Sequence, residues 1–217
     1  MDLEDRFSDF WKRIGAKTPA EHVYHELLIR YLEKHRHYHT LDHIAFSLGE
    51  FDKVSKLTEN PNAMEFAIWF HDAVYDVGNS HPMNEANSAN LAMSAAMEAG
   101  LGERKEEGFG KKFVQKIVSL ILSTVQSYNP IEFEDKLMRD IDLAILGQPF
   151  NAYNKYRQEV RQEFKQFNDR DYAFSRTNFL IKLLERKDEL YQTSQFRDRL
   201  LFPARQNIKR EIEILRK

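Results

Sequence analysis

Hydrophobic residues recur three or four positions apart along most of the chain, the spacing of one face of an α-helix. The first segment places Phe7, Phe10, Trp11 and Ile14 in this way and is followed by Gly15. Glycine commonly follows the last residue of a helix, because it adopts a positive φ without strain. The pattern therefore predicts an N-terminal helix that ends near residue 14.

Helix-start signals precede the next three predicted helices. Thr18-Pro19-Ala20-Glu21 has the order of a capping box: an N-cap threonine, a proline at the first helical position and a glutamate at the third. Thr40 precedes a third helix, and Asn60-Pro61 precedes a fourth. The fourth is apolar on nearly all sides between Met64 and Val74, which predicts a helix at the centre of the fold.

The same periodicity continues to the end of the chain. It predicts helices at about 84–99, 111–126, 136–146, 150–166, 176–190 and 203–216. Composition agrees, because 21 leucines outnumber the 8 valines and 6 threonines, and β-branched residues favour strands. Glycine and proline are scarce, at 8 and 6 residues. The sequence therefore predicts an all-α fold.

Composition also narrows the classes of function. The chain has no cysteine, which excludes disulfides, cysteine-ligated zinc, iron–sulfur clusters and thiol nucleophiles. A net charge of −2 disfavours a general nucleic-acid-binding surface. The N-terminal segment is acidic and amphipathic, unlike a signal peptide, and apolar runs such as Phe66–Phe70 fall well short of a membrane span. We therefore expect a cytoplasmic protein without a membrane or nucleic-acid partner, and a homo-oligomer remains open.

Charge is divided unevenly along the chain. Residues 1–150 carry a net charge of −8, whereas residues 151–217 carry a net charge of +6. The basic excess is either a solvated face, or a set of arginines of which some reach an anionic ligand.

Histidine is the polar residue that stands out, since six of the eight lie between His35 and His81. His71-Asp72 lies within AIWFHDAVYD, the most apolar helical segment of the chain, where an unpaired charge is costly to bury. A metal ion would compensate Asp72 and also bind the imidazole of His71. Alternatively, His71 is a hydrogen-bonded core residue and Asp72 points to solvent.

Two further pairs add candidate metal ligands. His39 and His43 are four apart, so they lie close to one helical face, although a surface cluster is the alternative. Asp140 and Asp142 interrupt an apolar segment, although a helix N-terminus also favours acidic residues. Two histidines with two aspartates would suit one divalent Mn, Fe, Co, Ni or Zn ion; Mg fits less well, because imidazole is a poor ligand for it.

Four motifs occur in the order YHTLDHI, FHDAVYD, NEANSA and DIDLAILG. This order resembles the HD-domain metal-dependent phosphohydrolases, and the RQEF, SR and ARQN segments near the C-terminus are similar to the tail of predicted HD-superfamily hydrolases with an RHYHT-type segment. The resemblance implies an HD-type helical bundle that forms a single domain over residues 1–217. Its motif core would span residues 36–147, with helices 150–217 packed on it.

The resemblance also implies which residues bind the metal. The ligands would be His43, His71, Asp72 and Asp142, with Asp140 as the alternative to Asp142. Many HD proteins carry a further histidine that helps to hold a second metal, but the corresponding stretch here, LSTVQSYNP, has none. A single metal ion is therefore expected, and the diiron oxygenase branch of the superfamily is disfavoured.

The activity implied by the resemblance is hydrolysis of a phosphate monoester or diphosphate of a small, nucleotide-like substrate by metal-activated water. Asp72 and Glu85 would be catalytic, although Glu85 could equally be a solvated acid in the first turn of a helix. Two other functions stay open. One is an inactive metal- or ligand-binding HD module with a sensor or structural role, and the other is a helical scaffold with incidental histidines.

Phosphate requires cationic or polar partners, and arginine is the best geometric match for its oxygens. The candidate substrate-binding residues are His39, Arg36, Arg161, Arg176 and Arg205. A solvated surface position is the alternative for each arginine. Tyr38 and Tyr75 flank the expected ligands and could stack on a base, although core packing would explain them equally well.

Overall fold

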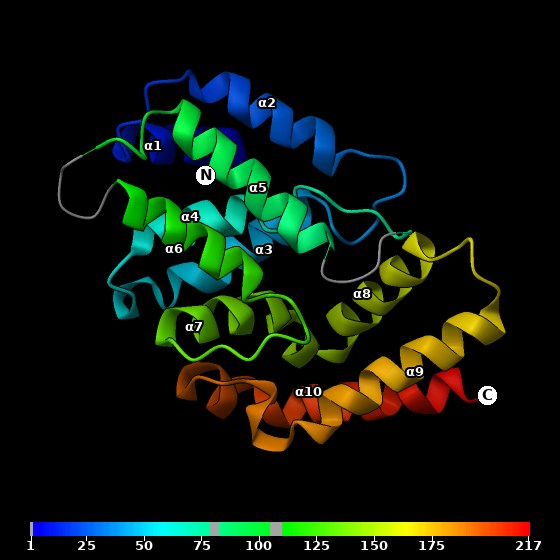
Figure 1. Ribbon diagram of the computed structural model, residues 1–217. Helices are drawn as coiled ribbons and strands as arrows, with labels where there is room; N and C mark the ends of the chain where they lie inside the picture. The colour runs from blue at the N-terminus through cyan, green and yellow to red at the C-terminus, as the bar shows by residue number, and fades with distance from the viewer. Residues whose placement is uncertain (1, 79–82, 105–109) are drawn as a thin grey trace. The chain divides into compact units, whose positions relative to one another are not determined.

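The computed structural model describes residues 2–78, 83–104 and 110–217, and within them the chain forms helices and no strand (Figure 1). The all-α prediction is therefore confirmed. The α-helices are α1 (Leu3–Arg13), α2 (Ala20–Tyr31), α3 (Leu41–Asp52), α4 (Pro61–Phe70), α5 (Met83–Glu98), α6 (Lys111–Leu122), α7 (Phe133–Asp142), α8 (Phe150–Glu163), α9 (Asp169–Glu185) and α10 (Ser194–Leu215). The 3-10 helices are η1 (Ser55–Leu57), η2 (Leu143–Gly147) and η3 (Lys187–Leu190).

The chain divides into two compact units, residues 1–138 and residues 139–217. The division falls inside α7, which is one continuous helix. The single domain expected from the sequence, with the C-terminal helices packed on the motif core, stays a prediction. Within the described ranges, no helix is both long enough and apolar enough to cross a membrane.

Helix α4 lies at the centre of the first unit, as its apolar sequence predicts. Every residue from Ala63 to Phe70 is almost inaccessible to solvent, and α4 packs against α3, α5 and α6. The aromatic face of α1 also covers it. The rings of Phe7 and Trp69 meet edge to face at 5.1 Å, and those of Phe10 and Phe66 at 6.0 Å. These contacts fix α4 from Ala63 to Phe70.

The predicted starts of α3 and α4 are confirmed, whereas the capping box before α2 is wrong. The Thr40 hydroxyl accepts the Asp42 backbone N–H at 3.3 Å, and Pro61 is the first residue of α4. Before α2, the cap position belongs to Pro19, and no described residue bonds to the buried Thr18 hydroxyl. The Thr18 carbonyl instead accepts the indole N–H of Trp11 at 2.9 Å. The chain before α2 is therefore held by a contact with α1 and not by a helix cap.

Two helices of the second unit begin earlier than the sequence predicts. Helix α9 begins at Asp169, because the Asn168 side chain caps it by accepting the Asp171 backbone N–H at 2.9 Å. Helix α10 begins at Ser194 and contains Pro203, which therefore does not start the helix. A proline removes a single helical hydrogen bond, and the contacts of α10 with η2, η3, α8 and α9 outweigh that loss.

A buried polar network joins α8, α9 and α10 within the second unit. The Arg176 Nε group donates to Glu211 Oε1 at 2.9 Å, and Arg176 Nη2 donates to the Tyr156 hydroxyl at 3.1 Å. The Tyr153 hydroxyl donates to the other Glu211 oxygen. The arginine, both tyrosines and the glutamate are all nearly inaccessible, so the network satisfies a charge pair inside this unit.

Two isoleucines provide a matched test of the core of the first unit. Ile117 in α6 is fully buried, whereas Ile131, between α6 and α7, is 79% exposed. We expect Ile117→Ala to lower the free energy of unfolding by about 2–5 kcal/mol, because it leaves a cavity. Ile131→Ala should change it by less than about 0.5 kcal/mol. Urea unfolding followed by circular dichroism measures both, and equal effects would contradict this description of the core.

Candidate metal centre

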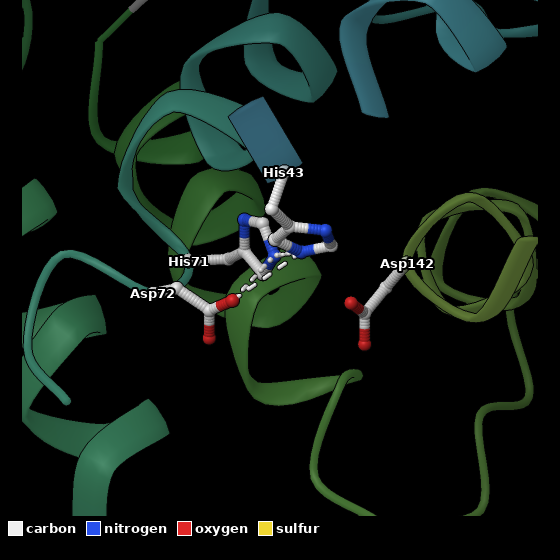
Figure 2. A group of neighbouring side chains, drawn as sticks. All are labelled: His43, His71, Asp72 and Asp142. Atoms are coloured by element: carbon white, nitrogen blue, oxygen red, sulfur yellow. Dashed lines mark hydrogen bonds and ion pairs between the residues drawn. The ribbon is translucent and has the colours of Figure 1, made fainter. Parts of the chain in front are cut away.

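Three side-chain atoms of the first unit form a nearly equilateral triangle (Figure 2). His43 Nε2 lies 3.1 Å from His71 Nε2 and 3.3 Å from Asp72 Oδ2, and His71 Nε2 lies 3.2 Å from Asp72 Oδ2. Metal–ligand bonds of about 2.0–2.2 Å at octahedral or tetrahedral angles separate neighbouring ligand atoms by about 2.8–3.6 Å. All three edges of the triangle fall within this range.

Local structure aims the two imidazole rings. His43 is the third residue of α3, so the Thr40 cap sets its position, and His71 follows the last residue of α4. His71 Nδ1 lies 2.9 Å from the Ile68 carbonyl oxygen, which can only accept a hydrogen bond. His71 Nδ1 therefore carries the proton, and the lone pair of Nε2 faces Asp72.

The electrostatics of the triangle favour a cation at its centre. His71 Nε2 and Asp72 Oδ2 are both acceptors, and the single Nε2 proton of a neutral His43 cannot satisfy both equally. Burial by itself would raise the pKa of Asp72, but the neighbouring imidazoles of His71, His39 and His43 lower this pKa well below its usual range. Asp72 therefore carries a negative charge at neutral pH.

One ligand atom each from His43, His71, Asp72 and Asp142 lies within 4.8 Å of the others, so this cluster could hold a metal ion (Figure 2). Asp142 ends α7, the helix that begins in the first unit, where Asn60 and Thr58 donate to Glu134.

Asp140, the alternative fourth ligand, points elsewhere. Its carboxylate accepts the backbone N–H of Gln192 at 2.9 Å, and the backbone N–H and hydroxyl of Thr193 at 2.7 and 2.6 Å. Residues two apart on a helix face different directions, so α7 cannot aim Asp140 and Asp142 at the same point. The structure thus brings Asp142 into the cluster and uses Asp140 to hold the start of α10.

Arg36 contacts the backbone around the ligands. Its guanidinium group donates to the carbonyls of His39 at 3.1 Å, Asp72 at 2.6 Å and Ala73 at 3.1 Å, and its Nε group donates to Glu33 at 2.9 Å. The side chain is fully buried. This arrangement favours a role in positioning the backbone around His71 and Asp72 over the substrate contact expected from the sequence. A sequence cannot show whether an arginine faces a substrate or a backbone carbonyl.

The NEANSA motif, residues 84–89, supports the turn that follows α4, a role that sequence reasoning missed. Ser88 Oγ accepts the Val74 N–H at 3.0 Å and donates to the Val74 carbonyl at 3.2 Å. The Asn84 side chain accepts the Asp76 N–H at 3.1 Å and donates to the Asp76 carbonyl at 3.0 Å. Asn84 and Ser88 are four apart on α5, a spacing that places both on one helical face.

Glu85 is buried in the first turn of α5, immediately after Asn84, so it is not the solvated acid that the sequence offered as the alternative. Glu85 and Ser88 are three apart and therefore lie on adjoining parts of the helix surface. Because Ser88 contacts the turn that follows Asp72, Glu85 lies on the part of α5 next to that turn.

Two tyrosine rings lie next to histidines close to the candidate metal ligands. The Tyr75 ring stacks on His39, with centroids 4.1 Å apart, and on His35, with centroids 6.3 Å apart. The Tyr38 ring lies 4.9 Å from that of His43. His39 thus contacts Tyr75, close to the candidate metal ligands, although it does not belong to the cluster of four.

The predicted phosphate-binding arginines of the C-terminal segment all lie in the second unit. Arg161 donates to the carbonyls of Phe164 and Phe167 and pairs with Asp169, and Arg176 is buried against Glu211. Arg205 is partly exposed on α10. Structural partners therefore occupy much of the donor capacity of Arg161 and Arg176.

No protein-family model matches this chain, and the searches of curated proteins and of solved structures find no match either. The likeness to HD proteins therefore rests on the motifs of the chain itself. The geometry of His43, His71 and Asp72 is an independent observation, because it depends on distances and not on resemblance.

Metal content distinguishes the two aspartates of α7. We expect about one divalent ion per chain in the wild type and little in Asp72→Ala, with weakened binding in Asp142→Asn. Asp140→Asn should keep the metal but lower the melting temperature, because it weakens the contacts to Gln192 and Thr193. Elemental analysis of the folded protein after dialysis against Mn²⁺ or Zn²⁺ measures this. Loss of metal from Asp140→Asn but not from Asp142→Asn would reverse the assignment.

The role of Arg36 is tested by Arg36→Lys, which keeps the charge but cannot reach three carbonyls at once. We expect the metal affinity to fall by about 10–100-fold, as when other groups that orient metal ligands are lost. Arg30→Lys, at a partly exposed residue of α2 that pairs with Glu26, is the matched control and should leave the affinity unchanged. Competition with a chromophoric chelator gives the affinities, and equal values for both variants would refute the positioning role.

Proposed function

We propose that this protein is a metal-dependent phosphohydrolase of the HD type, which cleaves a phosphate monoester or diphosphate of a small, nucleotide-like substrate. The observation that carries the proposal is the triangle of His43 Nε2, His71 Nε2 and Asp72 Oδ2, with edges of 3.1–3.3 Å. Its occurrence within motifs of HD-type order supports the same conclusion.

The chain supplies the residues that such a reaction requires. His43, His71, Asp72 and Asp142 would hold one divalent ion, and two nitrogen and two oxygen ligands suit Mn, Fe, Co, Ni or Zn better than Mg. A metal so bound supplies a water of lowered pKa and polarises a phosphoryl oxygen. Arg36, Ser88 and Asn84 would keep the ligand turn fixed.

Two side chains near the ligands are assigned roles with the substrate. Glu85, buried on α5, would accept a proton from the attacking water or pass one to the leaving group. His39 would bind the phosphate or an adjacent part of the substrate, because its ring lies 6.0 Å from that of His43. Tyr75, stacked on His39, would orient that ring.

Phosphate release tests the proposal. We expect the full chain with Mn²⁺, Co²⁺ or Zn²⁺ to release phosphate from at least one compound in a panel of nitrophenyl phosphate, nucleoside monophosphates and nucleoside diphosphates. Asp72→Ala should abolish the activity. Glu85→Gln should keep the metal while reducing kcat by about 10²–10⁴-fold, and Glu98→Gln, at the exposed end of α5, is its control.

Each other outcome has a defined meaning. Bound metal without phosphate release from any compound would favour an inactive metal-binding module. Unchanged kcat in Glu85→Gln would remove Glu85 from the mechanism but leave the metal centre standing. Equal metal content in the wild type and Asp72→Ala would mean that His43 and His71 have a structural role and do not bind a metal.

A further inference from the structure

The second unit contains a pocket of its own, with a volume of about 410 Å³. Side chains of α8, α9 and α10 line it, and all of them belong to residues 139–217. These three helices are labelled in Figure 1. The volume is within the usual range of about 300–1,000 Å³ for small-molecule sites. None of the candidate metal ligands contributes to it.

Three arginines line this pocket, and two of them keep unused hydrogen-bond donors. Arg161 is fixed by Asp169 and by two backbone carbonyls. Among the residues that the structure describes, Arg157 bonds through its Nε group alone, which donates to Asn154 at 2.7 Å. Arg170 is exposed and forms no ion pair or side-chain hydrogen bond with any described residue. The terminal N–H groups of Arg157 and Arg170 are therefore available to an anion.

The two acids of the pocket do not neutralise these arginines. Glu211 already pairs with Arg176 and accepts from Tyr153, and Asp169 pairs with Arg161. Each acid thus has its own arginine, which leaves two positive charges in excess. A planar guanidinium group is the side chain best matched to phosphate oxygens.

Tyr172 supplies a third, independent observation. The residue is only 7% exposed and lines the pocket, yet its buried hydroxyl has no hydrogen-bond partner within the described parts of the chain. A buried polar group without a partner costs free energy, so each such group calls for an explanation. Burial, partly offset by Arg176, raises the pKa of Tyr172 to about 12, so the hydroxyl remains a donor at neutral pH.

The remaining wall is apolar, formed by Ala173 on α9 and by Ile214 and Leu215 at the end of α10. A pocket lined by both cations and aliphatic carbons suits a ligand with a charged group and an apolar body. Inorganic phosphate alone would leave this wall uncovered.

We infer that this pocket binds a small phosphate monoester with an apolar body. Its phosphate group contacts the terminal N–H groups of Arg157 and Arg170 and accepts a hydrogen bond from the Tyr172 hydroxyl, for which the pocket wall shifts enough to expose that oxygen. The apolar body covers Ile214 and Leu215. This site is separate from the metal centre and does not depend on the proposed hydrolase activity. Anion binding at this site would also explain part of the excess of basic residues in residues 151–217.

Isothermal titration of the full chain with phenyl phosphate, and with inorganic phosphate for comparison, tests the inference. The protein carries Asp72→Ala, so that the candidate metal centre does not contribute. We expect one molecule of phenyl phosphate per chain, bound more tightly than inorganic phosphate. The double variant Arg157→Gln/Arg170→Gln should weaken binding by at least about 10-fold. Arg197→Gln/Arg199→Gln removes the same charge from α10 and should leave it unchanged.

Tyr172→Phe separates binding from folding. It keeps the ring, over which the Arg161 guanidinium lies at 4.6 Å, and removes only the unpartnered hydroxyl. We expect weaker phenyl phosphate binding without a lower melting temperature of the free protein. Absence of binding, or equal losses in the two double variants, would overturn the inference. Binding that occurs in the wild type but not in Asp72→Ala would place phenyl phosphate at the metal centre instead.

Discussion

The candidate metal centre depends on the turn that follows α4. This turn carries His71 and Asp72, whose facing atoms are both acceptors and lie only 3.2 Å apart. Without a cation these atoms repel each other, so the surrounding structure must hold them together. Arg36 holds the carbonyls of Asp72 and Ala73, and Ser88 holds both backbone groups of Val74. These hydrogen bonds therefore hold the two acceptors close together without help from a cation.

The central position of α4 gives this turn a rigid base. A helix whose residues are buried on all sides cannot rotate or slide without disrupting its neighbours, because protein interiors are closely packed. The final turn of α4 then presents the Ile68 carbonyl to His71 Nδ1, which fixes the imidazole tautomer. The apolar residues that form the core thus also orient the His71 imidazole. Core packing and the geometry of the candidate site therefore depend on the same helix.

The sequence predicted the parts of this structure that depend on local signals. The apolar segment around His71-Asp72 singled out that pair, whereas the resemblance to HD proteins was needed to choose His43 over His39. Spacing could not separate Asp140 from Asp142, since that choice depends on where α10 begins. The backbone contacts of Arg36 and the failure of Thr18 as a cap were equally out of reach, because both depend on tertiary partners.

The basic C-terminal segment shows why net charge alone does not define a site. Arg161 and Arg176 contribute to the charge excess, yet carboxylates and carbonyls within the second unit use much of their hydrogen-bonding capacity. Such arginines join helices and have little left for a ligand. Arg157 and Arg170 have the same charge, but their terminal groups have no partner among residues that the structure describes, and they line a pocket. A candidate anion site is therefore better identified by the number of arginine N–H groups without a partner that reach one pocket. The structure shows this number, whereas the composition does not.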